Sequence, residues 1–238
     1  MATTASRIRV YSPTGLLAPA AAQASIELYW LPLGAGGWFV RLNERIYEAI
    51  HALLEGRRPL DLYHSALVVR VPEGRFVIED AWPIPDADGP SSRGVLVEGP
   101  VGSRRMARFR VFRYEVRRWR DGVIADANKA VASPQLLSDD PLVARHLLDS
   151  VSSLPSPVWG RDELKTGEMW NSNSVIAWVL AQSGLPTDAI RPPAGGRAPG
   201  WQAGLVIARR QQPSDKRAGH GAGGATSPVG RPGVAATA

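Results

Sequence analysis

Apolar and β-branched residues cluster in several short stretches of this chain, in a pattern typical of β-strands. Residues 26–33 (IELYWLPL) predict one strand. Residues 64–71 (HSALVVRV) and 75–82 (RFVIEDAW) predict an antiparallel hairpin, because only a Pro-Glu-Gly connection separates them. Residues 94–98 (GVLVE) predict a further strand.

Two later stretches also resemble strands. Residues 106–119 are aromatic and arginine-rich, and their apolar alternation changes phase between Val111 and Phe112, which predicts a β-bulge or two joined strands. Residues 201–208 (WQAGLVIA) predict a last strand.

Three other stretches have helical patterns. Apolar residues recur every three or four positions over residues 42–53, which predicts an amphipathic helix. Asp140 and Pro141 are typical of a helix start, and Pro155 limits where that helix ends. Residues 175–181 (VIAWVLA) are apolar on every side, so this helix is expected to be buried. Helices beside a run of antiparallel strands predict an α+β domain.

Length and charge define the domain organisation. The chain has 238 residues and 44% apolar residues, enough for one domain with a substantial core. We expect a flexible segment over residues 1–24, a single domain over 25–208, and a disordered basic Gly/Ala/Pro-rich tail over 209–238. The net charge of +6 lies in the two ends, because residues 25–208 contain equal numbers of basic and acidic residues. A neutral body is not typical of a nucleic-acid-binding domain.

The chain lacks the residue types or spacings that several kinds of functional site require. The chain has no cysteine, which excludes disulfides, thiolate zinc sites and a cysteine nucleophile. The four histidines do not have metal-ligand spacing, and the Gly-rich pattern at 219–224 follows no strand, so we expect no metal and no cofactor. No apolar run is long enough to span a bilayer. Residues 7–24 only loosely resemble an export signal, and we expect a cytoplasmic protein.

Three positions carry candidate chemistry. His64, at the start of a predicted strand, is a residue type that accepts and returns protons near neutral pH. Glu79 lies in the next strand and is our first choice for a carboxylate that orients the imidazole; Asp80 is its competitor. Ser172 precedes the buried helix, where unpaired backbone N–H groups stabilise a developing negative charge. The alternative for Ser172 is that it only caps the helix.

The order of these positions resembles the circularly permuted papain-like families, which include permuted NlpC-type peptidases and the lecithin:retinol acyltransferase type. Residues 63–69 (YHSALVV) resemble the histidine strand, and residues 171–178 (NSNSVIAW) resemble the nucleophile helix. The resemblance implies a papain-like hydrolase or acyltransferase, with His64 as base, Glu79 as orienting residue and Ser172 in the place of the usual cysteine. It implies a small-molecule, peptide or lipid substrate that carries an amide or ester.

Residues 104–120 contain eight arginines and one acid, Glu115, with aromatic residues between them. This stretch suggests a second hypothesis, a catalytically inactive papain-like module that binds an anionic partner such as a lipid head group. The alternative is a solvated strand face whose arginines pair with acids elsewhere in the neutral body.

Overall fold

A computed structural model of the chain describes residues 24–33, 60–83 and 94–212. The helix predicted at 42–53 lies outside these residues, as do the terminal segments 1–23 and 213–238. Within the described part, seven strands and three α-helices form an α+β fold, as the sequence predicts.

The sheet is almost entirely antiparallel, with the strand order β4-β5-β3-β2-β1-β6. A short strand, β7, pairs in parallel with the first residues of β2. The strands are β1 (Ser25–Pro32), β2 (Asp61–Val71), β3 (Gly74–Ala81), β4 (Val95–Pro100), β5 (Arg113–Arg120), β6 (Gln135–Ser138) and β7 (Gly196–Arg197). The hairpin prediction is confirmed, since β2 and β3 pair antiparallel up to Val71 and Gly74.

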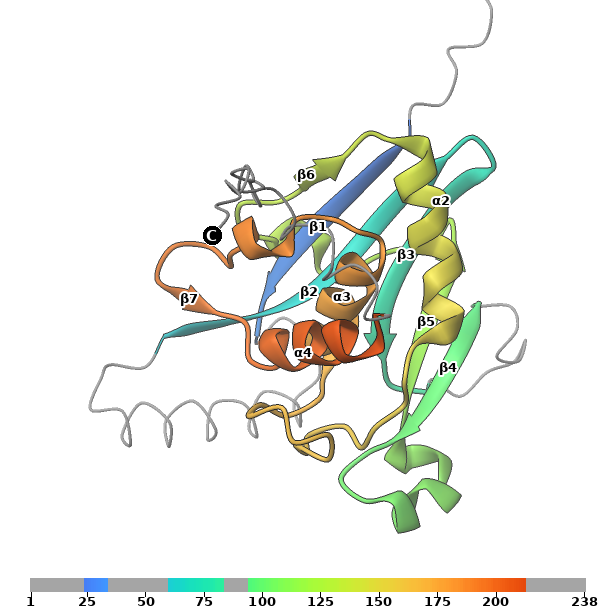
Figure 1. Cartoon of the computed structure of the whole chain (residues 1–238), viewed down its shortest axis with the longest axis vertical. Coiled ribbons are helices and arrows are strands. Elements are labelled where there is room, and N and C mark those ends of the chain that lie inside the picture. Colours follow the sequence, from blue (N-terminus) through green and yellow to red (C-terminus); the bar gives the residue numbers. More distant parts are fainter. Residues whose placement is uncertain (1–23, 34–59, 84–93, 213–238) are drawn as a thin grey trace, which may run out of the picture.

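The helices α2 (Pro141–Ser150), α3 (Ser172–Gln182) and α4 (Trp201–Gln211) gather on one face of the sheet (Figure 1). Asp140 caps α2 by accepting a hydrogen bond from the Leu142 N–H at 2.7 Å, and Pro141 follows at the first helical position. Helix α3 packs against β2 and β3, and residues 173–180 are all buried, as the sequence predicts.

The predicted strand at residues 201–208 is wrong, because these residues begin helix α4. Ala203, Gly204 and Leu205 are buried because this helix packs closely on α3. A Cβ at Gly204 would lie 2.1 Å from the Ser174 carbonyl oxygen, so glycine is what permits this approach. Helix α4 ends at Gln211, and the predicted start of the tail at residue 209 therefore falls inside it.

The prediction for residues 106–119 is only partly correct. The strand β5 begins at Arg113, and the residues before it form two 3₁₀ turns, η2 (Arg104–Arg108) and η3 (Arg110–Phe112). The phase change at Val111 and Phe112 therefore marks the end of these turns, not a bulge inside a strand.

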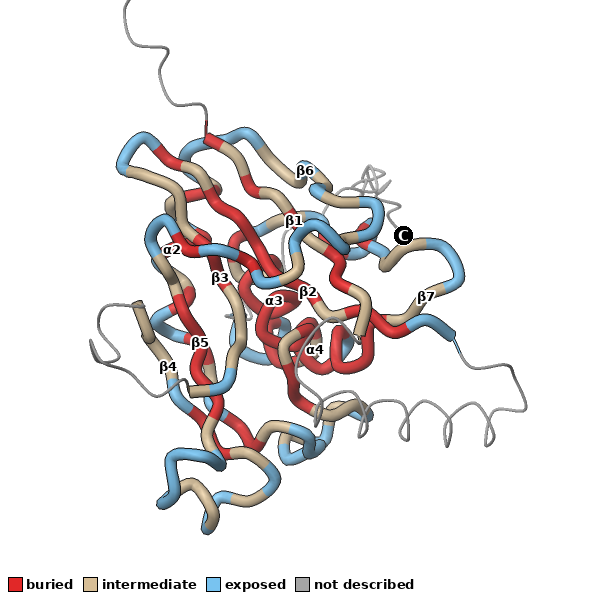
Figure 2. The backbone as a smooth tube through the Cα atoms, turned by 180° about the vertical axis from the view of Figure 1, so that it is seen from behind, coloured by how far each residue is buried: buried red, intermediate tan, exposed pale blue. Residues whose placement is uncertain are grey.

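The sheet separates two apolar cores. The larger core lies under the helices and includes Leu67 and Ile78 from the hairpin. The smaller core covers the opposite face, where Ala66, Val68 and Val77 pack with Leu31 and with Ile124 of the loop after β5. Figure 2 views the chain from behind and shows the buried residues concentrated in the sheet and in α3.

Candidate functional site

The first turn of α3 contacts the first residues of β2. The Asn173 side chain donates to the Tyr63 carbonyl and to the Pro199 carbonyl, both at 2.9 Å, and accepts from the Ser65 hydroxyl at 2.9 Å. All three of the buried side chains Ser65, Asn171 and Asn173 are thereby tied into one polar network. This network fixes the start of α3 against the strand that carries His64.

His64 and Ser172 line the same small cavity at this junction, although they are far apart in the sequence. The cavity has a volume of about 10 Å³, which leaves room for no more than one water molecule. Its lining residues are Leu33, Leu62, His64, Met169, Asn171, Ser172, Asn173 and Pro199. No hydrogen bond among the described residues joins the two side chains; what brings them together is the shared cavity.

Ser172 occupies the first position of α3, but it is not the cap. Asn171 is the N-cap, and its side-chain oxygen accepts from the N–H groups of Asn173 at 3.0 Å and Ser174 at 3.3 Å. The Ser174 hydroxyl in turn accepts from the Asn171 N–H at 3.1 Å, which completes a capping box. The capping role considered for Ser172 is therefore filled by Asn171, and the half-buried Ser172 hydroxyl is left for other contacts.

The backbone N–H of Ser172 has no acceptor within the ranges that the structure describes. It lies at the positive end of the helix dipole, while the next two N–H groups are occupied by Asn171. A carbonyl oxygen that gains negative charge next to Ser172 would find this donor free.

His64 lies opposite Leu31 in the register between β1 and β2, and it has the same alternation along β2 as Ala66 and Val68 of the smaller core. It therefore belongs to the sheet face that lies away from α3, and it reaches the cavity only at the end of the sheet. Burial lowers the pKa of His64 to about 4, and the charge of Asp126 opposes this in part. The imidazole is therefore neutral at physiological pH, which is the form that accepts a proton.

Glu79 has a different set of contacts and does not line the cavity. The β3–β5 register places it opposite Arg117, and its carboxylate lies 3.6 Å from the Arg117 guanidinium. Arg117 is buried and also contacts the buried Glu115 at 2.9 Å. Burial raises the pKa of Glu79, and the Arg117 charge lowers it. The structure thus places His64 and Ser172 along one small cavity without a hydrogen bond between them, and places Glu79 in a buried network with Arg117.

The two carboxyl oxygens of Asp80 are buried, and neither has a hydrogen-bond partner among the described residues. Burial raises the pKa of Asp80 to about 8; the nearby Trp159 indole and Arg117 only partly oppose this, and Glu79 adds to it. Asp80 is therefore a protonated acid at neutral pH.

Sequence reasoning missed Asp126. It precedes the 3₁₀ turn η4 (Ala127–Lys129), in the segment that covers the smaller core, and its φ of 58° is unusual for a residue other than glycine. Its carboxylate lies 2.7 Å from the Lys129 ammonium. No local sequence pattern marks this loop residue, because only the packing of the loop over β1 and β2 brings its charge to His64.

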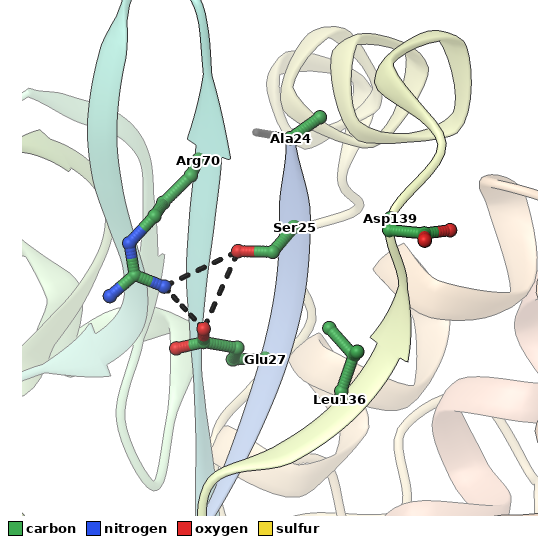
Figure 3. A pocket seen from close by; sticks show the side chains of 6 residues that line it. All are labelled: Ala24, Ser25, Glu27, Arg70, Leu136 and Asp139. Atoms are coloured by element: carbon green, nitrogen blue, oxygen red, sulfur yellow. Dashed lines mark hydrogen bonds and ion pairs between the residues drawn. The ribbon is translucent and has the colours of Figure 1, made fainter. Parts of the chain in front are cut away.

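Two larger hollows contain no candidate catalytic pair. A groove of about 640 Å³ borders β1, β2 and β6, and Figure 3 shows Arg70, Ser25 and Glu27 in it, turned toward one another. These groups satisfy each other: Arg70 donates to the Ser25 hydroxyl at 3.3 Å and to Glu27. No group of this trio is left without a partner for a ligand.

A groove of about 440 Å³ near α2, α3 and α4 includes His146 and Ser150. The His146 Nε2 atom lies 3.2 Å from the Gln182 carbonyl, and the Ser150 hydroxyl donates to the Leu147 carbonyl at 2.8 Å. Both side chains therefore bind backbone carbonyls, and not each other.

Comparisons with protein-family models, with curated proteins and with solved structures found no match for this chain. The α+β class therefore stands on the arrangement of the strands and helices themselves. Among the described residues there is no cluster of potential metal ligands, and no helix there has the length and apolar character to cross a membrane.

Proposed function

We infer that this chain is a hydrolase or acyltransferase with a papain-like site, in which Ser172 attacks the carbonyl carbon of an amide or ester and His64 acts as general base. One observation carries the proposal: the two residues line one cavity at the first turn of a buried helix. The neutral imidazole is free to accept a proton, although the burial that keeps it neutral also makes it a weaker base than an exposed histidine. The uncapped N–H of Ser172 suits oxyanion stabilisation.

In the first half-reaction the Ser172 oxygen forms a bond to the carbonyl carbon, and its proton passes to His64. The carbonyl oxygen becomes an oxyanion that accepts a hydrogen bond from the Ser172 N–H. When the intermediate collapses, the amine or alcohol leaves with the proton from His64, and an acyl-serine remains. In the second half-reaction, water or an acceptor molecule gives its proton to His64 while its oxygen or nitrogen forms a bond to the acyl carbon. The bond to the Ser172 oxygen then breaks, and His64 returns the proton to that oxygen.

A serine hydroxyl is a far weaker acid than a thiol, so the reaction depends on His64 during the attack itself. Asp126 supplies the carboxylate charge that acts on His64 in this arrangement, while Glu79 is paired with Arg117. The small volume of the cavity means that a substrate must displace cavity-lining side chains; Met169, the flexible one, is the natural candidate to move.

A fluorophosphonate probe tests the proposal, because it labels only activated serines. We expect the wild type to be labelled, and both Ser172→Ala and His64→Gln to lose labelling. Ser152→Ala is the matched control, since Ser152 is exposed and its hydroxyl only donates to the Asp149 carbonyl. Labelling that persists in Ser172→Ala would show that another serine reacts.

The non-catalytic binding module is the second candidate, and the size of the cavity favours it. It predicts that neither the wild type nor Ser172→Cys is labelled or turns over any ester or amide substrate. Iodoacetamide distinguishes the two candidates through the reactivity of a cysteine at position 172. If the Ser172→Cys variant reacts rapidly at neutral pH and the double variant Ser172→Cys/His64→Gln does not, His64 activates the thiol and the non-catalytic hypothesis fails.

A further inference from the structure

Residues 102–112, called the basic lobe here, project beyond the end of the sheet next to β4 and β5 (Figure 1). Their backbone consists of the two 3₁₀ turns η2 and η3. Figure 2 shows that most of this lobe is exposed, while the strand β5 that follows it is largely buried.

Three large apolar side chains of the basic lobe face solvent. Val111 is 70% exposed, Phe109 47% and Phe112 37%. Single exposed apolar residues are common on proteins, but three within four consecutive residues at a projecting turn form a patch that is typical of an interaction surface.

The backbone that presents these side chains is firmly held. The Val101 N–H donates to the Phe112 carbonyl at 2.8 Å and closes the base of the basic lobe. The Phe112 N–H donates to the Phe109 carbonyl at 2.9 Å inside it. The Arg113 guanidinium reaches back to the Ala107 carbonyl at 2.6 Å. The apolar residues are therefore displayed by a folded turn, which limits the ordering cost of binding.

The charge of the basic lobe is strongly positive. The basic lobe contains four arginines and no acid. Arg104 is paired with Glu163 at 2.5 Å, and Arg110 lies 3.7 Å from the Glu115 carboxylate. The ion pairs of the described residues do not involve Arg105 or Arg108, and both are exposed.

We propose that the basic lobe binds the surface of an anionic lipid bilayer, with Val111, Phe109 and Phe112 entering the interface and Arg105 and Arg108 contacting lipid phosphates. Such a surface has two layers, the acyl chains and, outside them, the negatively charged head groups. The exposed apolar residues suit the first layer, and the basic residues beside them suit the second. This binding is independent of the reaction proposed for Ser172.

A single-stranded nucleic acid suits the basic lobe less well. Nucleic-acid bases stack on open aromatic faces. The Arg108 guanidinium already covers one face of Phe109, 4.7 Å from the ring centre, and the most exposed residue is the aliphatic Val111. A bilayer interface accepts a branched aliphatic side chain, whereas base stacking does not use one.

Sedimentation of the full chain with vesicles tests the proposal. We expect binding to vesicles of phosphatidylcholine mixed with phosphatidylserine, and little binding to phosphatidylcholine alone. Arg105→Gln with Arg108→Gln should bind the mixed vesicles about 30-fold more weakly, at roughly fivefold for each basic residue. Phe109→Ser with Val111→Ser should lose about tenfold or more and still respond to salt, because its charges remain.

Lys216→Gln with Arg217→Gln is the control, since it removes the same charge from the basic C-terminal stretch. It should weaken vesicle binding far less than the double arginine variant does. The proposal is overturned if the basic-lobe variants bind vesicles like the wild type or if the control loses as much. It is also overturned if the wild type ignores vesicles and binds oligo-deoxythymidine through Arg105 and Arg108. Melting temperatures of the variants close to that of the wild type establish that the fold is retained.

Discussion

Asp80 makes the stability of this protein depend on pH in an unusual direction. Its pKa in the folded chain is raised from 3.8 to about 8 by burial. The folded state therefore holds a proton that the unfolded chain releases above about pH 4. Between about pH 4 and pH 8, the folded state therefore binds one proton more than the unfolded state does. The free energy of unfolding falls as pH rises through this range, because protons become scarcer and the state that binds more of them loses stability.

The change Asp80→Asn removes this effect. The rise in pKa is about four units, and each unit corresponds to about 1.4 kcal/mol, so the wild type loses on the order of 6 kcal/mol between pH 3 and pH 9 through this one group. The asparagine amide does not titrate. We therefore expect the variant to gain stability relative to the wild type as pH rises, by up to that amount.

Urea unfolding followed by tryptophan fluorescence at several pH values between 4 and 9 measures this difference. At each pH, the free energy of unfolding of the variant is subtracted from that of the wild type. The change of this difference with pH is the quantity of interest, because any cost of burying the amide that does not depend on pH cancels. Asp139→Asn is the matched control, because it makes the same substitution at an exposed carboxylate. Parallel stability curves for the wild type and Asp80→Asn would refute the reasoning, since they would mean that Asp80 ionises normally in the folded chain.

Other predictions concern the site and the packing around it. If His64 is the base, turnover of an ester substrate falls on the acid side with an apparent pKa near 4 in place of 6.5, and a fall near 6.5 would contradict this role. Asp126→Asn should lower kcat more than Glu79→Gln, because only Asp126 acts electrostatically on the imidazole; the reverse order in steady-state kinetics would restore Glu79 as the orienting residue. Gly204→Ala should destabilise the fold by about 1–3 kcal/mol in urea unfolding, because its methyl group would collide with the Ser174 carbonyl, and an unchanged midpoint would contradict the close packing of α3 and α4. Asn171→Ala should cost about 1–2 kcal/mol through loss of the cap, and Asn171→Ser should cost less; equal losses would mean that capping is not the main role of this residue.

Local patterns were sufficient where one element carries one unambiguous signal. The β2–β3 hairpin follows from two apolar runs joined by a Pro-Glu-Gly turn, and α3 follows from an all-apolar run after polar capping residues. His64 and Ser172 stay candidates from the sequence; in the structure both line one cavity, but β2 begins three residues before His64.

Where two periodicities fit the same residues, the sequence alone could not decide. Residues 201–208 are compatible with a strand, but Gly204 permits contact with α3, and the burial gained there selects a helix. The pattern over residues 106–112 predicts part of a strand, and only the fold shows these side chains at a projecting turn.

The surroundings of the candidate site were decided by contacts between distant segments. Glu79 was expected beside His64, but the pairing of β3 with β5 sets it against Arg117. Asp126 comes near His64 because a loop folds over the sheet, 62 positions further along the chain. Side-chain periodicity is a local property, whereas strand pairing and loop packing minimise exposed apolar area and unpaired charge over the whole molecule. The chain thus encodes its elements residue by residue, and the neighbours of each charged group are defined only after those elements have packed.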